Sequence, residues 1–571
     1  MSEYAEYVER AETAANAAKA SATQTTTDKN TVVALYNEIK GLIDNGTGTV
    51  CKFYECTSVG DTTWSGYEWL LVTETTDDGV STFYKKADDI TPGFTWTVVR
   101  PVIGRSYTQD ALVEINYLYQ DTSTDEPEIP DEPEIPEEPE QPEVPEEPGV
   151  PLTLTAEQAD STVKLMAVGT PVVDSLVYRT DSADAWMDYD VDTVITLVNV
   201  GDYVQFRNLS ETLSTSSDSY VQFSMTGKIA ASGNIQSMLN WNSSCNDYCY
   251  YNMFTDCKSL TTAPALPATT LADSCYRVMF EDCTALTTAP ELPATTLASS
   301  CYRYMFYGCT SLTTAPTLPA TTLADYCYTC MFAACTSLTE APALSATTLA
   351  YNCCYEMFNN CSALTTAPEL PATTLAKRCY YSMFSYCTSL TTAPELPATT
   401  LASECYSYMF YGCTSLTTAP ELPATTLDSS CYSYMFWGCT SLTTAPELPA
   451  TTLDSECYSY MFYGCTSLTT APTLPATTLA KRCYYSMFSY CTSLTTAPAL
   501  PAITLANSCY SYMFYGCSNL NSITVAFTSW TGYGTASWVK GVADTGTFNC
   551  PEELPVEYDE DRIPSGWTVS N

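Results

Sequence analysis

The stretch CYSYMFYGCTSLTTAPELPATTLDSS, residues 405–430, decides how most of this chain folds. Its frame, CYxxMFxxCxxLTTAPxLPATTLAxx, recurs every 26 residues from Cys249 to about Leu520, in eleven units. One such unit cannot bury its apolar face except against its neighbours. A period in the twenties therefore predicts a solenoid of stacked units over residues 246–520.

Two patterns within a unit predict its parts. Cys405, Met409 and Cys413 lie four residues apart, which is the spacing of the inward stripe of a short helix. An extended segment and its return follow, with inward positions at Leu416, Ala419, Leu422 and Leu427. Because Pro420 and Pro423 have no amide N–H to donate to the hydrogen bonds between neighbouring strands, each strand should be only a few residues long. The expected fold of this region is an α/β solenoid.

The 28 cysteines need a separate explanation. Two cysteines eight apart on one helix are separated by about 12 Å of rise, too far for a disulfide. Stacking would instead align like cysteines in ladders, where reduced thiols fill a narrow interior. The isolated pair Cys327 and Cys330 lacks the second pair that a zinc site requires, so no metal site is expected.

The rest of the chain is modular. Residues 1–48 carry a helical heptad seam that favours self-association, most plausibly as a trimer, although an ordinary amphipathic helix fits as well. Residues 49–120 alternate as short strands, for example 68–72 and 95–99, and predict a small β domain. Within residues 121–151, proline recurs at every third position from Pro127 to Pro151, which predicts an acidic polyproline II linker about 75 Å long. A β-sandwich over 152–245 and a C-terminal cap over 521–571 flank the solenoid.

Composition excludes several classes of function. The chain has no histidine, which removes the imidazole bases of hydrolase triads and His-ligated zinc. Its net charge of −43 repels nucleic acid and anionic membranes. We see no secretion signal and no membrane span, and we expect no cofactor. An aspartate cluster near Asp188 could hold calcium, but it lacks the glycine and glutamate of an EF-hand loop, so a solvated surface fits better.

The frame MFYGCTSLTTAPELPATTLA resembles the BspA-like leucine-rich repeat, with a unit slightly longer than the family's usual one. Residues 225–239 and 546–569 resemble the caps beside such repeats in gut bacterial surface proteins and in phages of those hosts. The alanine-rich opening helix and small β module resemble, more weakly, the attachment ends of phage fibres. The resemblance implies surface recognition, and it carries over no catalytic residues.

Binding capacity should lie where the units differ. An aromatic residue often precedes the second cysteine, and these positions form a candidate aromatic ridge: Tyr307, Tyr411, Trp437, Tyr463 and Tyr515. The ridge would suit sugar rings or a protein, unless the rings only cover the edge of the neighbouring repeat. A second candidate is an acidic row that could attract a basic receptor or remain solvated: Glu369, Glu395, Glu421 and Glu447.

These observations favour a non-enzymatic recognition protein. The first expectation is a phage virion fibre, of head or tail, that attaches to virion proteins through its N-terminus and contacts a host surface protein or glycan through the solenoid. The alternative is an adhesin on the bacterial cell surface. A glycan-active enzyme using two carboxylates is a third reading, but the repeats show many similar acids and no distinct pair.

Overall fold

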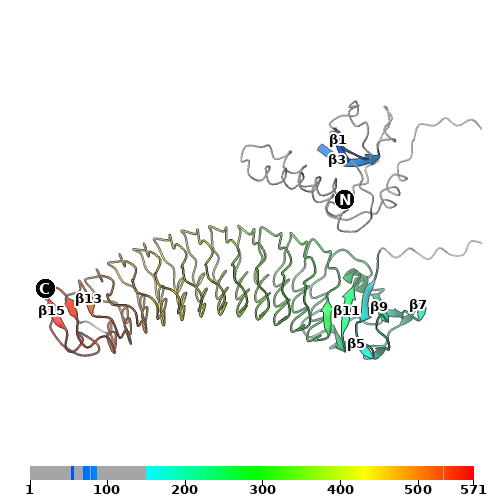
Figure 1. The fold of residues 1–571 in the computed structure, drawn as a ribbon. Helices are drawn as coiled ribbons and strands as arrows, with labels where there is room; N and C mark the ends of the chain where they lie inside the picture. The colour runs from blue at the N-terminus through cyan, green and yellow to red at the C-terminus, as the bar shows by residue number, and fades with distance from the viewer. Residues whose placement is uncertain (1–52, 57–68, 77–78, 87–148, 531–532) are drawn as a thin grey trace, which may run out of the picture. The chain divides into compact units, whose positions relative to one another are not determined.

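The computed structural model describes residues 53–56, 69–76, 79–86, 149–530 and 533–571. The chain divides into two units, Met1–Glu143 and Val144–Asn571 (Figure 1). In the first unit, β1 (Phe53–Cys56), β2 (Trp69–Thr76) and β3 (Gly79–Lys86) form one sheet, with β1 parallel and β3 antiparallel to the central β2. The predicted opening helix, the linker as far as residue 148 and the strand expected at 95–99 lie outside the described residues.

The second unit begins with two sheets that pack face to face. One sheet has the strand order β12-β11-β4-β9-β6-β7 and the other the order β10-β5-β8. Phe206 of the first sheet meets Phe223 of the second edge to face, with ring centroids 5.3 Å apart. The elements are β4 (Leu152–Ala156), β5 (Ser161–Val168), β6 (Leu176–Thr180), β7 (Ala183–Asp188), β8 (Ile195–Leu197), β9 (Tyr203–Asn208), β10 (Tyr220–Thr226), β11 (Ile229–Ser232), the 3-10 helix η2 (Ile235–Leu239) and β12 (Leu260–Thr262).

From Cys249 onward the chain coils in stacked units, which follow one another as a gently curved row (Figure 1). The cysteine-rich half of each unit is a series of tight turns with two alternating sets of backbone hydrogen bonds. Tyr406 donates to the carbonyl of Cys431 in the next unit (3.0 Å), and Phe410 donates to that of Met435 (2.9 Å). Between them, the amide of Met409 donates back to the carbonyl of Tyr406, three residues earlier (3.3 Å).

The prediction of a short helix is therefore wrong, but the prediction that its inward residues are buried is confirmed. Every fourth residue has a left-handed backbone, as at Glu404 (φ 58°), Tyr408 (φ 58°) and Gly412 (φ 70°), which an α-helix excludes. Alternate amides bond to the next unit rather than to the fourth residue before them. Cys405, Met409 and Cys413 still point inward and are completely buried, because this spiral has a period of four residues, close to the helical 3.6. No α-helix occurs in the described part of the solenoid.

The proline-containing half of each unit is extended. Single parallel bridges join Thr418 to Thr444 and Thr426 to Thr452, and equivalent threonines are joined along much of the solenoid. The prolines restrict pairing to such single bridges. Leu416, Leu422 and Leu427 are buried as predicted, and Ala419 is half-buried against the core.

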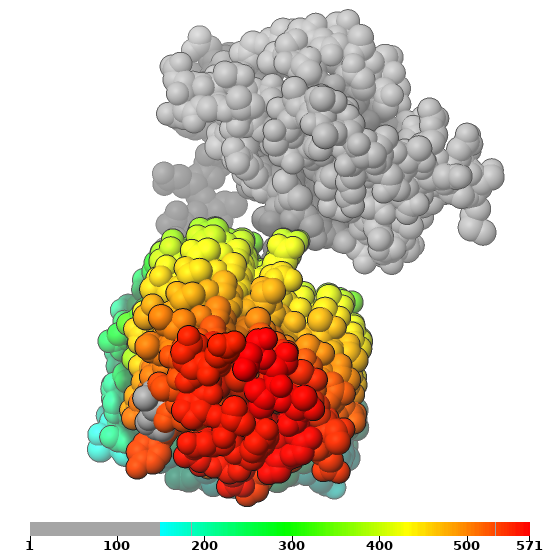
Figure 2. Space-filling view, turned by 90° about the vertical axis from the view of Figure 1, so that its left-hand side faces the viewer, coloured from blue at the N-terminus to red at the C-terminus, as the bar shows by residue number. Residues whose placement is uncertain are grey.

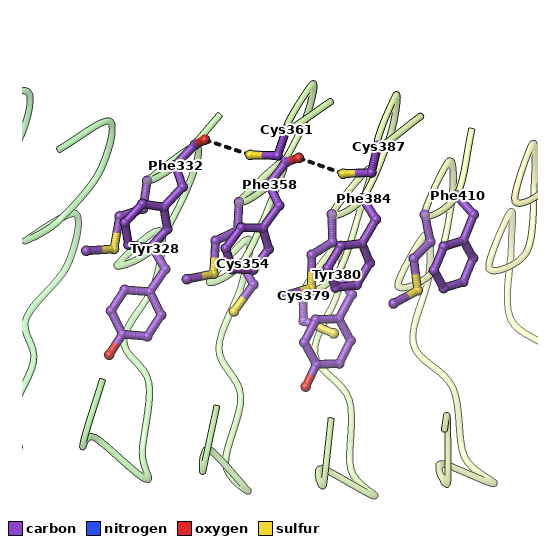
Figure 3. Packing of buried hydrophobic residues seen from close by; sticks show 14 of the residues in the cluster. Tyr328, Phe332, Cys354, Phe358, Cys361, Cys379, Tyr380, Phe384, Cys387 and Phe410 are labelled. Atoms are coloured by element: carbon purple, nitrogen blue, oxygen red, sulfur yellow. Dashed lines mark hydrogen bonds between the residues drawn. The ribbon is translucent and has the colours of Figure 1, made fainter. Parts of the chain in front are cut away.

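Identical side chains stack on one another through the interior of the solenoid (Figure 3). Phenylalanine rings form one continuous column, with neighbouring centroids 5.1–5.9 Å apart: Phe223, Phe254, Phe280, Phe306, Phe332, Phe358, Phe384, Phe410, Phe436, Phe462, Phe488 and Phe514. A parallel column of buried tyrosines is interrupted where Cys354 replaces the ring (Figure 3). Such offset stacking adds about 1 kcal/mol per pair to the burial itself.

The second cysteine of each unit forms a ladder beside the phenylalanines. The thiol of Cys361 donates to the carbonyl of Phe332 (3.1 Å), and that of Cys387 to the carbonyl of Phe358 (3.1 Å) (Figure 3). All the cysteines between Cys245 and Cys550 carry free thiols. This geometry explains why a thiol is used, because it is small, apolar and still able to satisfy a buried carbonyl.

Both ends of the columns are closed. At the start, Phe223 of β10 donates its amide to the carbonyl of Met253 (2.7 Å), just as each later phenylalanine does to its neighbour. At the other end, Trp538 terminates both aromatic columns by contacting Tyr510 and Phe514. A parallel sheet of β13 (Ser522–Thr524), β14 (Thr547–Asn549) and β15 (Thr568–Ser570) follows. The C-terminal residues cover this end of the solenoid (Figure 2).

Candidate binding surface

The structure brings three residues of the predicted ridge together. Tyr411, Trp437 and Tyr463 belong to consecutive units and stack almost in parallel, with centroids 4.4 Å and 5.3 Å apart. The tight turns place them there, because each precedes a left-handed glycine and so lies outside the inward stripe. The three rings are half-buried, since each covers part of its neighbour.

The other two ridge residues lie apart from this stack. Tyr307 packs against Tyr304 of its own unit (5.6 Å), and the next three units carry Ala333, Asn359 and Ser385 at its position. Tyr515 does not stack on Tyr463 but contacts Tyr490, which it meets at 65° and 5.4 Å, and Tyr512 at 6.0 Å.

A second aromatic row, which sequence reasoning missed, runs beside the first. Its central members Tyr408, Tyr434 and Tyr460 stack 4.4 Å apart. The whole row consists of Tyr355, Tyr381, Tyr408, Tyr434, Tyr460, Tyr485 and Tyr512. The signal was a tyrosine two or three residues after the first cysteine in nine of the eleven units, of which the last seven are consecutive. Its position shifts by one residue between units, which hid the row in a strict 26-residue alignment.

Stacking decides what these rows can offer to a ligand. The two faces of Trp437 are covered by Tyr411 and Tyr463, so Trp437 presents its ring edge and the two tyrosines present phenol hydroxyls. Burial and the neighbouring Tyr386 raise the pKa of Tyr411 to about 12. Burial likewise raises the pKa of Tyr381 and of Tyr485 to about 12. These hydroxyls stay protonated at neutral pH and can donate hydrogen bonds.

Two arginine–glutamate ion pairs lie beside the second row, one near each of its ends. Arg378 lies over Tyr381 (5.7 Å) and forms an ion pair with Glu404 (2.6 Å). Arg482 lies over Tyr485 (4.2 Å) and forms an ion pair with Glu456 (3.2 Å). The guanidinium groups are thus largely neutralised by carboxylates, and their planes are occupied by tyrosine rings.

The predicted acidic row is exposed throughout. Glu369, Glu395, Glu421 and Glu447 all have exposed side chains. Glu447 accepts a hydrogen bond from Thr473 of the next unit (3.2 Å). The row is a regular line of carboxylates on the proline-containing half of the solenoid, separate in sequence from the aromatic rows.

Two further clusters carry side chains of the kinds that bind metal ions. Cys327 and Cys330 are buried, and burial raises the pKa of the Cys330 thiol to about 12. Asp188, Asp190 and Asp192 are exposed, and Asp192 pairs with Lys164 (3.5 Å). Within the described residues, no group of three or more cysteine or carboxylate side chains is arranged to hold a metal ion.

One thiol differs from the ladder thiols. Cys245, just before the first unit, is only partly buried and lies 3.8 Å from the hydroxyl of Tyr276. Hydrogen bonds from Cys249 and Cys275 lower the pKa of Cys245 to about 4, while burial raises the pKa of those two partners. Among the thiols that the structure describes, Cys245 is therefore the one whose lowered pKa favours the thiolate form.

Comparisons with known proteins identify the repeats. No curated protein matches the chain, and no solved structure matches it. Across the parts of the chain that the structure describes, no helix is both long and apolar enough to cross a bilayer. The family of the BspA type leucine rich repeat region matches in six copies, over residues 243–391, 354–495 and 403–533. Because these matches together cover just over half of the sequence, the chain belongs to the BspA-type leucine-rich repeat family.

Proposed function

We propose that this chain is a non-enzymatic recognition protein of a phage virion, a head or tail fibre whose solenoid contacts a host or environmental surface. BspA-type repeats are typically protein-interaction modules without catalytic activity, and their carriers are commonly displayed on surfaces. The observation that carries the recognition role is the pair of aromatic rows. Stacked rings at a solvent boundary cost little entropy to immobilise and offer both apolar area and hydroxyl groups.

The virion location rests on sequence features alone. They are the weak likeness of the opening residues to fibre attachment ends and the proline-rich segment that would project the solenoid from a particle. The alternative is a bacterial cell-surface adhesin, which the same repeats suit equally well. Mass spectrometry of purified virions, compared with the membrane fraction of uninfected bacteria, decides between them, because the chain should be enriched in only one.

The ridge is tested by replacing Tyr411, Trp437 and Tyr463 together with serine in the full chain. Attachment to gut bacterial cells that bind the unaltered chain should weaken by about two orders of magnitude, since each ring contributes about 1 kcal/mol. Unchanged attachment with an unchanged melting curve would contradict a role for the ridge and direct attention to the acidic row. A large fall in melting temperature would show that the rings serve mainly to stabilise the fold.

The proposed fibre should also self-associate through its N-terminal region. The heptad seam over residues 4–22 favours a trimer, whereas the capped solenoid leaves no open column end for stacking. Light scattering should give the mass of a trimer for the full chain and for fragment 1–125. It should give the mass of a monomer for fragment 152–571. A monomeric full chain would remove the support for homo-oligomerisation.

A further inference from the structure

Two tyrosines stand out from the aromatic rows because their rings are turned. Tyr386 meets Tyr411 at 72° with centroids 5.2 Å apart, and Tyr490 meets Tyr463 at 65° and 5.3 Å. Each therefore makes an edge-to-face contact with one end of the Tyr411, Trp437 and Tyr463 stack. Among the aromatic contacts of the described residues, neither ring is stacked face to face on another, although Tyr490 also meets Tyr515 at 65° and 5.4 Å. Tyr386 is 46% exposed and Tyr490 41%.

The backbone makes room for both rings. Tyr386 reaches over Gly412 of the next unit, where an added Cβ would come within 2.8 Å of its ring. Tyr490 reaches over Gly516 in the same manner, also at 2.8 Å. The two sites are built from one repeated segment, KRCYYSMFSYC, which occurs at 377–387 and again at 481–491. They lie four units apart, which is about 19 Å at the usual spacing of paired strands.

Both tyrosines occupy a backbone conformation that favours glycine. Their φ angles are 60° for Tyr386 and 61° for Tyr490, as the turn requires at this position (compare Gly412, Gly438 and Gly464 in the units between them). A bulky side chain in this region is strained. Glycine would fit at no such cost, so replacing either tyrosine with glycine should not strain the turn. Left-handed residues other than glycine occur throughout the turns, so the conformation belongs to the fold and is not peculiar to these two tyrosines.

The strip between the two rings carries no charge, although the chain as a whole has a net charge of −43. From Tyr386 to Tyr490, the residues just before and after each second cysteine are only tyrosine, tryptophan, glycine, serine and threonine. A charged ligand would find no group of opposite charge on this strip. A neutral ligand rich in hydroxyl groups would find hydroxyls and aromatic rings.

We infer that this strip binds a linear neutral glycan, with one sugar stacked on Tyr386, another on Tyr490, and the sugars between them hydrogen-bonded to the hydroxyls of Tyr411 and Tyr463. This inference rests on the proposed recognition function and names its ligand class. The apolar C–H face of a sugar suits an exposed ring face, and its hydroxyls suit the phenol groups. Two subsites on one chain give avidity only to an oligosaccharide long enough to reach both.

The test measures binding of the full chain to neutral linear oligosaccharides by titration calorimetry, using a disaccharide and an octasaccharide each of β-glucan, mannan and galactan. At least one octasaccharide should bind at least tenfold more tightly than its own disaccharide. Replacing Tyr386 and Tyr490 together with glycine should weaken that octasaccharide about a hundredfold. The melting temperature should stay the same or rise, because glycine is the residue of the intervening units. A double replacement by phenylalanine keeps the ring faces and should retain binding.

Three outcomes would overturn the inference. The first is no binding of any neutral octasaccharide, and the second is unchanged binding by the double glycine variant. The third is equal affinity for long and short oligosaccharides, which would show that the two rings do not act on one ligand. Cell attachment separates the inference from the proposed function. If the double glycine variant still attaches to cells and the Tyr411, Trp437 and Tyr463 variant does not, recognition stands and the glycan site falls.

Discussion

At the scale of single residues, the backbone of the turns explains where this solenoid tolerates change. Every fourth residue of a turn segment is left-handed, yet many of these positions carry residues other than glycine, such as Glu404 and Tyr408. Each costs about 1 kcal/mol relative to an unstrained residue. The stacking of neighbouring units supplies the compensation, because the same turn also presents alternate amides to the next unit.

Two glycines at equivalent positions should respond differently to the same substitution. Gly412→Ala adds a Cβ within 2.8 Å of the Tyr386 ring, whereas Gly438→Ala meets nothing closer than the Cα of Gly412 at 3.9 Å. Both glycines have φ near +70°, a conformation that strains alanine. Gly438→Ala should therefore lower the free energy of unfolding by about 1 kcal/mol. Gly412→Ala should cost more and should displace Tyr386.

Urea denaturation of the two variants, followed by circular dichroism, checks the difference. Equal losses of stability would show that Tyr386 moves aside freely and is not held over Gly412.

At the scale of elements, the period of the sequence was more informative than its local pattern. The 26-residue repeat correctly predicted stacked units, the inward cysteines and the interrupted strands. The helix was wrong because Cys405, Met409 and Cys413 fit a period of four as well as a period of 3.6. Hydrogen bonds between units distinguish the two structures, and no local pattern records them. The ridge was found only in part, because whether outward rings touch depends on the spacing between units.

The C-terminal cap closes the phenylalanine and tyrosine columns at the C-terminal end of the solenoid. Trp538 is completely buried, contacts both Tyr510 and Phe514, and donates its indole N–H to the carbonyl of Arg562 (2.8 Å). Trp538→Ala should destabilise the last units by about 3–5 kcal/mol. In a solenoid such a loss stays near the damaged end, because each unit contacts only its neighbours.

Hydrogen exchange measured by mass spectrometry should therefore show protection lost around residues 500–571 and retained around Phe254. The exposed Tyr533→Ala is the matched control and should change neither region, since this side chain is 78% exposed. Uniform loss of protection along the whole solenoid would contradict the nearest-neighbour description.

At the scale of the whole molecule, the thiol ladder makes the solenoid sensitive to alkali. Burial raises the pKa of Cys361, Cys413 and Cys465 to about 12, and it raises the pKa of Cys387 and Cys439 well above the ordinary value of 9.0. A raised pKa in the folded state means that folding favours the protonated thiol. This preference contributes its full stability at pH values below the pKa of the thiol in the unfolded chain. The contribution is lost as the pH rises through the pKa of the thiol in the folded chain.

Stability should therefore be level from neutral pH to about pH 8.5 and fall steeply above about pH 9. Each thiol with a raised pKa lowers the free energy of unfolding by up to about 1.4 kcal/mol per pH unit. Burial raises the pKa of twenty-one repeat thiols, and together they exceed a domain's usual stability of about 5–15 kcal/mol. Melting temperatures across this range measure the fall. Cys413→Ala removes one titrating group, so its stability should decline with a slope smaller by one proton. Stability that stays level to about pH 11 would show that the thiols are oxidised or exposed, and alkylation of the unfolded chain without reductant would distinguish these two causes.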